Sequence, residues 1–85
     1  MKIKTGSVVK ASAGRDCGGY FVVTGTDNGF FLIADGKSRR LAKPKRKNPK
    51  HLAFTNSVID LNDITDKKLR RILREIGEAE RQEVI

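Results

Sequence analysis

The sequence contains few of the residues that small proteins use for covalent or metal-based stabilisation. Its 85 residues include one cysteine, one histidine and no tryptophan. A single cysteine rules out an intramolecular disulfide and a cysteine-based metal cluster. The chain also offers no nucleophile–base pair and no Walker-type loop, and it is too short to enclose a deep pocket. We therefore expect no metal site, no cofactor, no small-molecule substrate and no enzymatic activity.

Long apolar runs are also missing. The first residues, Met-Lys-Ile-Lys-Thr-Gly, lack the apolar stretch of a secretory signal. No window has the apolar length that spans a bilayer. Together with the single cysteine, this composition favours a reducing compartment, so we expect a cytoplasmic location and no membrane partner.

What the chain does contain suits one small domain. Hydrophobic residues make up 38% of it and charged residues 33%, so the chain can fold alone but cannot hold a large core. Aromatic residues are only 6% of the total. We therefore expect a core built from Val, Ile and Leu with a few Phe.

Five short segments have the alternation or the β-branched and aromatic content of strands. They are residues 7–12, 20–24, 30–34, 39–42 and 52–54. The alternation places Val8 and Val9 on opposite faces of the first segment. Glycine-rich turns separate the segments, and Asn28-Gly29 is the strongest hairpin signal. Short strands at this spacing predict a mainly β fold, namely a small, strongly bent sheet or barrel.

The C-terminal part changes to a helical period. Apolar residues recur at helical spacing at Leu69, Ile72, Leu73 and Ile76, and Thr65 is a candidate N-cap. Gly77 costs about 1 kcal/mol relative to Ala inside a helix, so we expect a kink or an end there. The predicted organisation is a barrel over residues 1–56, a linker at 57–64 and an amphipathic α-helix at 65–85.

The net charge of +8 is concentrated in the first part of the chain. Residues 1–52 contain twelve Lys or Arg against three Asp, a balance of +9, whereas residues 53–85 contain six against seven acidic residues, a balance of −1. In residues 37–51, eight of the fifteen residues are Lys or Arg and none is acidic. Such asymmetry indicates an anionic partner. Nucleic acid is favoured over a membrane surface, because prolines interrupt this segment and exclude an amphipathic helix.

A positive strip on a small β scaffold attracts a polyphosphate, because each neutralised phosphate releases condensed counterions. Pro44 and Pro49 lie within the strip. Proline cannot donate to a sheet ladder, so we expect the strip at a sheet edge or in a loop, exposed to a partner. The alternative is a set of solubilising charges. Mutual repulsion among eight like charges destabilises the free protein, which favours a function.

The spacing of residues 6–23 resembles the KOW motif of ribosomal proteins and transcription elongation factors. Glycines and apolar residues follow the motif at Gly6, Val9, Ala11, Gly14, Gly18 and Val23. Phe21 stands where many KOW sequences have another glycine, and a large apolar side chain there implies a filled interior.

The resemblance continues through Gly14-Arg-Asp-Cys-Gly-Gly-Tyr-Phe-Val-Val23, Phe31-Leu-Ile-Ala-Asp-Gly36 and Lys43-Pro-Lys-Arg-Lys-Asn-Pro-Lys-His-Leu52. These stretches, in this order, are similar to the fourteenth large-subunit protein of archaeal and eukaryotic ribosomes (the L-fourteen-e family). The similarity covers residues 5–56. It implies an SH3-like (KOW) β-barrel that binds ribosomal RNA.

We predict phosphate contacts from the basic residues in and near the strip. They are Arg15, Lys37, Arg39, Arg40, Lys43, Lys45, Arg46, Lys47 and Lys50, with His51 as a further hydrogen-bond donor or a structural residue. An Arg fork can hold phosphate through two N–H groups at once. Arg15 lies in a glycine-rich turn, where exposed backbone N–H groups can assist.

Two further sets of residues are candidates for RNA contacts. Tyr20 and Phe30 could stack on unpaired bases, and the alternative is that both belong to the core or cover its edge. In the helix, bases precede acids, an order that opposes the helix dipole. Lys67, Lys68 and Arg71 are therefore candidates for a second RNA contact, and the alternative is an ordinary charged face.

Together these observations predict a non-enzymatic RNA-binding protein, ribosomal or ribosome-associated, that functions in translation as part of a ribonucleoprotein. Its expected partners are ribosomal RNA and ribosomal proteins. One alternative is a KOW protein-interaction module that docks the transcription or translation machinery. Another is an assembly factor whose helix joins a partner helix through its apolar stripe.

Overall fold

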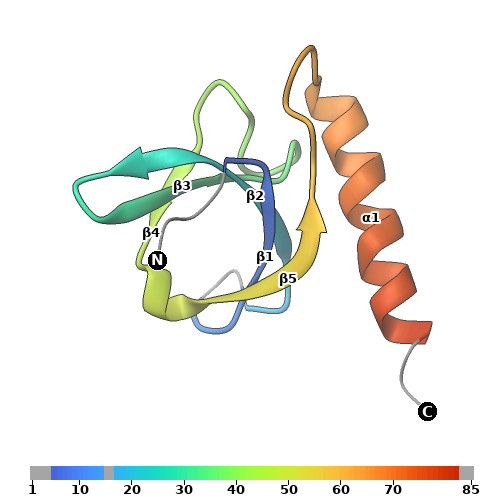
Figure 1. The fold of residues 1–85 in the computed structure, drawn as a ribbon, viewed down its shortest axis with the longest axis horizontal. Coiled ribbons are helices and arrows are strands. Elements are labelled where there is room, and N and C mark those ends of the chain that lie inside the picture. Colours follow the sequence, from blue (N-terminus) through green and yellow to red (C-terminus); the bar gives the residue numbers. More distant parts are fainter. Residues whose placement is uncertain (1–4, 15–16, 83–85) are drawn as a thin grey trace.

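The computed structural model describes residues 5–14 and 17–82 and contains, in these ranges, one antiparallel sheet and one long helix (Figure 1). The strands and helices are β1 (Ser7–Ala11), β2 (Tyr20–Asp27), β3 (Phe30–Ala34), β4 (Lys45–Lys47), the 3-10 turn η1 (Pro49–His51), β5 (Leu52–Val58) and α1 (Asp66–Gln82). The strand order in the sheet is β4-β3-β2-β1-β5. The predicted fold class is confirmed: the chain is mainly β, with a C-terminal helix.

The sheet bends strongly, so that strands distant in its order come close. A register shift between Val23 and Gly25 marks a bulge or irregularity in β2, and such irregularities bend and twist a strand. The ring of Phe31 on β3 contacts the ring of Phe54 on β5 edge-to-face, with centroids 6.0 Å apart. Because β3 and β5 are not neighbours in the order, this contact closes the sheet into a barrel-like body.

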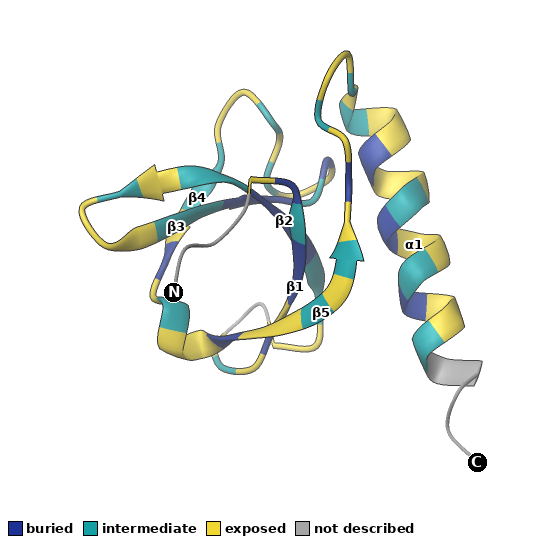
Figure 2. Cartoon of the chain, viewed as in Figure 1, coloured by how far each residue is buried: buried dark blue, intermediate teal, exposed yellow. Residues whose placement is uncertain are grey.

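Both faces of the central strands are buried, because α1 covers the outer face (Figure 2). The inner, barrel core contains Val9, Ala11, Phe21, Val23, Ile33 and Leu52. The outer, helix-covered core contains Val8, Val22, Ala34, Ile59, Leu69 and Leu73. The alternation predicted for residues 7–12 is confirmed, since Val8 and Val9 belong to different cores.

The helix begins as the sequence predicts. Thr65 is its N-cap: the Thr65 hydroxyl accepts a hydrogen bond from the Lys68 N–H at 3.2 Å. The apolar stripe of α1 packs on the sheet through Leu69 and Leu73, both buried. A partner helix therefore cannot use these two side chains unless α1 leaves the sheet. In the described part of the chain, no helix has the length and apolar content needed to cross a membrane.

The helix does not end at Gly77, because α1 continues to Gln82. Gly77 lies directly on Tyr20: a Cβ at this position would stand 3.3 Å from the Tyr20 ring atom Cε2. The missing side chain lets the helix approach the sheet. Close packing against β2 therefore compensates for the low helix propensity of glycine.

The strand predicted at residues 39–42 is also wrong. The Arg39 N–H donates to the Asp35 carboxylate at 2.8 Å, and the Arg39 carbonyl accepts from the Asp35 N–H at 2.8 Å. The backbone groups that would form a ladder are thus used within the loop. The strand forms instead at Lys45–Lys47, where Arg46 pairs with Leu32 of β3. β2 and β5 are longer than predicted, so the segment expected as a linker starts as the end of β5.

Candidate nucleic-acid interface

Residues 45–51, which comprise the edge strand β4, Asn48 and the turn η1, are called the edge segment. The sequence analysis predicted that prolines would keep the basic strip at an edge or in a loop, and β4 is an edge strand. Asn48 caps η1 by accepting a hydrogen bond from the Lys50 N–H at 3.0 Å. Lys50 and His51 are both exposed. The edge segment therefore presents these side chains on a backbone fixed by local hydrogen bonds.

Arg46 is the exposed arginine of the edge segment. Its guanidinium lies over the Phe30 ring, with the Cζ atom 4.8 Å from the ring centroid, a cation–π arrangement. The same guanidinium is 3.5 Å from the Asp27 carboxylate. Both side chains of this ion pair are about half exposed, 56% and 44%, so water weakens their attraction. Arg46 and Phe30 thus place a cationic group and an aromatic ring side by side next to the β2–β3 turn.

Lys45 and Lys47 differ from the residues around them. Lys47 is 7% exposed, and its Nζ atom donates to the Ala13 carbonyl at 3.3 Å. Lys47 pairs with Phe31 across β3 and β4, which places its side chain toward the interior of the barrel. The expected exposure of Lys47 is wrong, because its stem is buried and its ammonium bonds to the turn at Ala13. A phosphate contact by Lys47 stays a prediction. Lys45 is half-buried.

The loop at residues 35–44 connects β3 to the edge segment and carries the first bases of the strip. Arg40 and Lys43 are exposed, and both line a shallow hollow together with Ser38 and Arg39. The Arg39 Nε atom is buried and has no hydrogen-bond partner among the described residues. The hollow therefore brings together three of the predicted phosphate-binding residues.

This loop is tied to the start of α1. The Leu41 N–H donates to the Asp66 carboxylate at 2.8 Å, and the Arg70 guanidinium donates to the Gly36 carbonyl at 2.8 Å. Gly36 has a φ of 78°, and a Cβ there would collide with the Asp66 carbonyl oxygen. Only glycine combines this conformation with such a close approach. The loop and α1 therefore form one unit.

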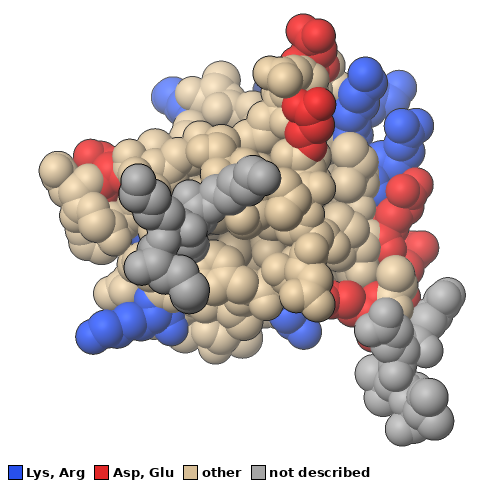
Figure 3. Space-filling view, viewed as in Figure 1, with Lys and Arg blue, Asp and Glu red and all other residues tan. Residues whose placement is uncertain are grey.

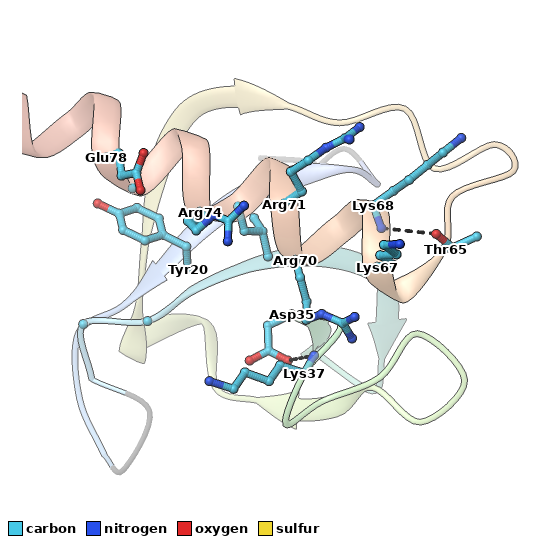
Figure 4. Close-up of a pocket in the computed structure, with 14 residues that line it drawn as sticks. Tyr20, Asp35, Lys37, Thr65, Lys67, Lys68, Arg70, Arg71, Arg74 and Glu78 are labelled. Carbon is cyan, nitrogen blue, oxygen red and sulfur yellow. Dashed lines mark hydrogen bonds between the residues drawn. The ribbon is translucent and has the colours of Figure 1, made fainter.

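A groove lies between the loop, β2 and the first half of α1, and is called the loop–helix groove (Figure 4). Its bases are Lys37, Lys67, Lys68, Arg70, Arg71 and Arg74, and its acids are Asp35 and Glu78. Figure 3 shows Lys and Arg gathered over the first half of α1 and acidic side chains over its second half. The fold thus unites Lys37 of the strip with the helix bases predicted as a second RNA contact.

Tyr20 lies at the wall of this groove. Its hydroxyl donates to the Glu80 carboxylate, its ring packs on Gly77, and the Lys10 ammonium is 5.6 Å from the ring centroid. This placement matches the alternative in which Tyr20 covers the edge of the core. Phe30, at 36% exposure, keeps more of its ring accessible for a base.

Some residues lie outside these groupings. Arg15, a predicted phosphate contact, falls outside the described residues. The sequence analysis missed Phe54 and Val58, which are 48% and 57% exposed on the edge strand β5. The sequence does not reveal that these two side chains are exposed, because their exposure depends on which strand lies at the edge of the sheet.

Among the described residues, no cluster of three His, Cys, Asp or Glu side chains could hold a metal ion.

Comparison with models of protein families and with curated proteins finds no match to this chain.

Proposed function

We propose that this chain is a non-enzymatic RNA-binding protein, related to the KOW proteins it resembles, that binds ribosomal RNA as a ribosomal or ribosome-associated protein. Contacts to phosphates supply most of the binding energy, and the barrel-like body holds the cations in position. The residues responsible are exposed bases of the strip: Arg40, Lys43, Arg46 and Lys50.

The observation that carries this proposal is the placement of the strip. Prolines and a capped 3-10 turn keep it at an edge strand and the adjoining loop, where five of its Lys and Arg side chains are exposed. Exposed like charges concentrated in one segment raise the electrostatic free energy of the protein alone. A polyanion removes this repulsion and gains further free energy from counterion release.

Arg46 and Phe30 add a second kind of contact. An arginine plane and an aromatic ring are the two side-chain surfaces on which RNA bases stack. In this pair the guanidinium already covers the ring, so one unpaired base can extend the same stack. This supports RNA with unpaired bases over fully double-stranded DNA.

The test is the salt dependence of binding to purified ribosomal RNA. Each phosphate contact contributes a slope of about 0.7 to 0.9 in log affinity against log salt. The triple variant Arg40→Gln, Lys43→Gln, Lys50→Gln should therefore lower the slope by about 2 units. Circular dichroism should show an unchanged fold, because these side chains are exposed.

A matched control comes from single substitutions. Lys10→Gln removes one exposed charge on β1, and Lys50→Gln removes one in the edge segment. Only Lys50→Gln should reduce the slope by a whole contact. Equal slopes for wild type, triple variant and control would contradict the proposal. Crosslinking in cells, followed by sequencing of the bound RNA, then decides whether that RNA is ribosomal.

A second candidate function is docking to a protein of the transcription or translation machinery. It is favoured by Phe54 and Val58, two large apolar side chains exposed on the edge strand β5. An edge strand also offers unpaired backbone groups to an extended segment of a partner. Binding of that kind should survive the triple variant and depend weakly on salt. It should be lost in Val58→Ser, which leaves the contact between Phe31 and Phe54 in place.

A further inference from the structure

Resting on the proposed function, we propose that the loop–helix groove is a separate binding site for the ribose–phosphate backbone of RNA, and that α1 must be docked for the site to exist. The groove extends the RNA interface from the edge segment to the helix-covered face of the sheet. Its cations come from two segments about 30 residues apart in sequence, the turn at Lys37 and the first half of α1.

The first argument is the charge of the groove. Six basic side chains and two acidic side chains line it. One of the two acids is engaged within the protein: the Asp35 carboxylate accepts hydrogen bonds from the Lys37 N–H at 2.9 Å and from the Arg39 N–H at 2.8 Å. Lys67, Lys68, Arg71 and Arg74 are exposed, so an excess of positive charge faces solvent in a hollow, where an anion is attracted most strongly.

The second argument is the rigidity of the groove. Arg70 is fixed by its hydrogen bond to the Gly36 carbonyl, and the far end of α1 is held by Gly77 on the Tyr20 ring. The walls therefore do not need to be ordered when a ligand binds, which reduces the entropic cost of association. Charges on an unanchored helix would lack this advantage.

The third argument is the uneven distribution of charge along the groove. Lys37, Lys67 and Arg70 lie at the end near the loop, whereas Glu78 lies beside Tyr20 at the other end (Figure 4). A phosphate chain is attracted to the first end and repelled from the second. Basic residues in the first turns of a helix are unfavourable for the helix itself, since they face the positive end of its dipole. A polyanion in the groove relieves both the dipole repulsion and the repulsion among these bases.

Glycines in the wall and several cations in a row favour an RNA backbone over an acidic protein. Gly18 and Gly19 form part of the wall, where the absence of side chains lets a bulky backbone approach. Arg71 and Arg74 carry planar forks that match the paired oxygens of a phosphate. A continuous RNA backbone also presents charges at regular spacing, which suits several cations in a row.

The first experiment measures affinity for purified ribosomal RNA with substitutions of opposite sign. The groove variant Lys67→Gln, Lys68→Gln, Arg71→Gln should bind about 100-fold more weakly at 0.1 M salt, with the salt slope reduced by about 2 units. Glu78→Gln should bind more tightly, because it removes a repulsive charge from the same groove. A loss of affinity in Glu78→Gln, or no change in the groove variant, would overturn the inference.

The second experiment locates the RNA. Cys17 is exposed, and it is adjacent to Gly18 at the groove wall, so an iron–EDTA group attached to it should cleave RNA bound in the groove. At saturating protein, the groove variant should lose this cleavage, whereas Arg46→Gln with Lys50→Gln should retain it. Cleavage that persists in the groove variant would overturn the inference.

The outcomes separate the two proposals. If wild-type protein does not bind ribosomal RNA at low salt, the proposed function itself fails. If edge-segment variants weaken binding but groove variants do not, the proposed function stands and the groove site is rejected. A competition experiment compares polyglutamate with an RNA of equal charge. If both displace bound RNA from the groove equally well, the groove is a site for acidic proteins and the inference is rejected.

Discussion

The two halves of the basic strip are consecutive in sequence, yet the protein holds them in different ways. The first half belongs to the loop at residues 35–44, which is tied to α1 by hydrogen bonds from Leu41 to Asp66 and from Arg70 to the Gly36 carbonyl. The edge segment is held instead by pairing of β4 with β3 and by the capped turn η1. The difference shows that proximity in sequence does not decide which charges act together.

The consequence is a regrouping of cations. Lys37 joins five bases of α1 in the loop–helix groove, whereas Arg46 joins Phe30 beside the β2–β3 turn. A contiguous strip in the sequence therefore contributes to two surfaces, and one of them depends on a helix that begins 15 residues after the strip ends.

The largest expected change in stability comes from weakening the packing of α1 on the sheet. Leu69 is fully buried between α1 and the sheet, so Leu69→Ala should lower the free energy of unfolding by about 2–5 kcal/mol. Urea denaturation measures this change. Arg71→Ala, an exposed position on the same helix, should change the value by less than about 0.5 kcal/mol. Similar values for both variants would show that α1 is not docked in solution.

A substitution at Gly36 tests the contact between the loop and α1 from the loop. Gly36→Ala places a methyl group at positive φ and against the Asp66 carbonyl, and should cost more than about 2 kcal/mol of unfolding free energy. Gly29 also has positive φ, at 84°, but nothing within 4 Å of the added methyl group. Gly29→Ala should therefore cost only about 1–2 kcal/mol. Equal costs would mean that the contact with Asp66 contributes nothing.

The smallest effect sharpens the comparison within the edge segment itself. Lys47→Ala removes a buried stem and its hydrogen bond to Ala13, and should cost about 1–2 kcal/mol of stability with little change in the salt slope of RNA binding. Lys50→Ala should do the reverse, because Lys50 is exposed. Urea denaturation measures the stability of each variant, and filter binding measures the salt slope of RNA binding. If Lys47→Ala lowered the slope by a whole phosphate contact, the burial of Lys47 would be contradicted.

Much of the fold was predictable because its signals are local. Asn28 and Gly29 adopt φ of 48° and 84°, as an Asn-Gly hairpin turn requires, and Thr65 caps α1 through its own hydroxyl. Prolines at 44 and 49 bracket β4 and leave it as an edge strand. Each of these features follows from backbone angles or donors within a few residues, so no distant contact is needed to predict it.

The incorrect predictions arise from contacts between segments that are distant in sequence. In the strand expected at residues 39–42, the Leu41 N–H donates to Asp66, 25 positions later, and this bond holds the segment as a loop against α1. Gly77 stayed within the helix because Tyr20, 57 positions earlier, packs against it. Lys47 became buried because β4 turned that side chain toward the barrel. In each case a contact between remote segments outweighed a local preference of about 1 kcal/mol.

The amino-acid sequence by itself thus determined a mainly β chain with a cationic strip at an exposed edge and an amphipathic helix after it, because periodicity, turn chemistry and proline act over short distances. Only the tertiary structure decided which bases share a surface, which lysine is buried and how α1 completes a groove. Burial and the pairing of charges depend on which elements meet in space, and that is settled by packing of both faces of the sheet.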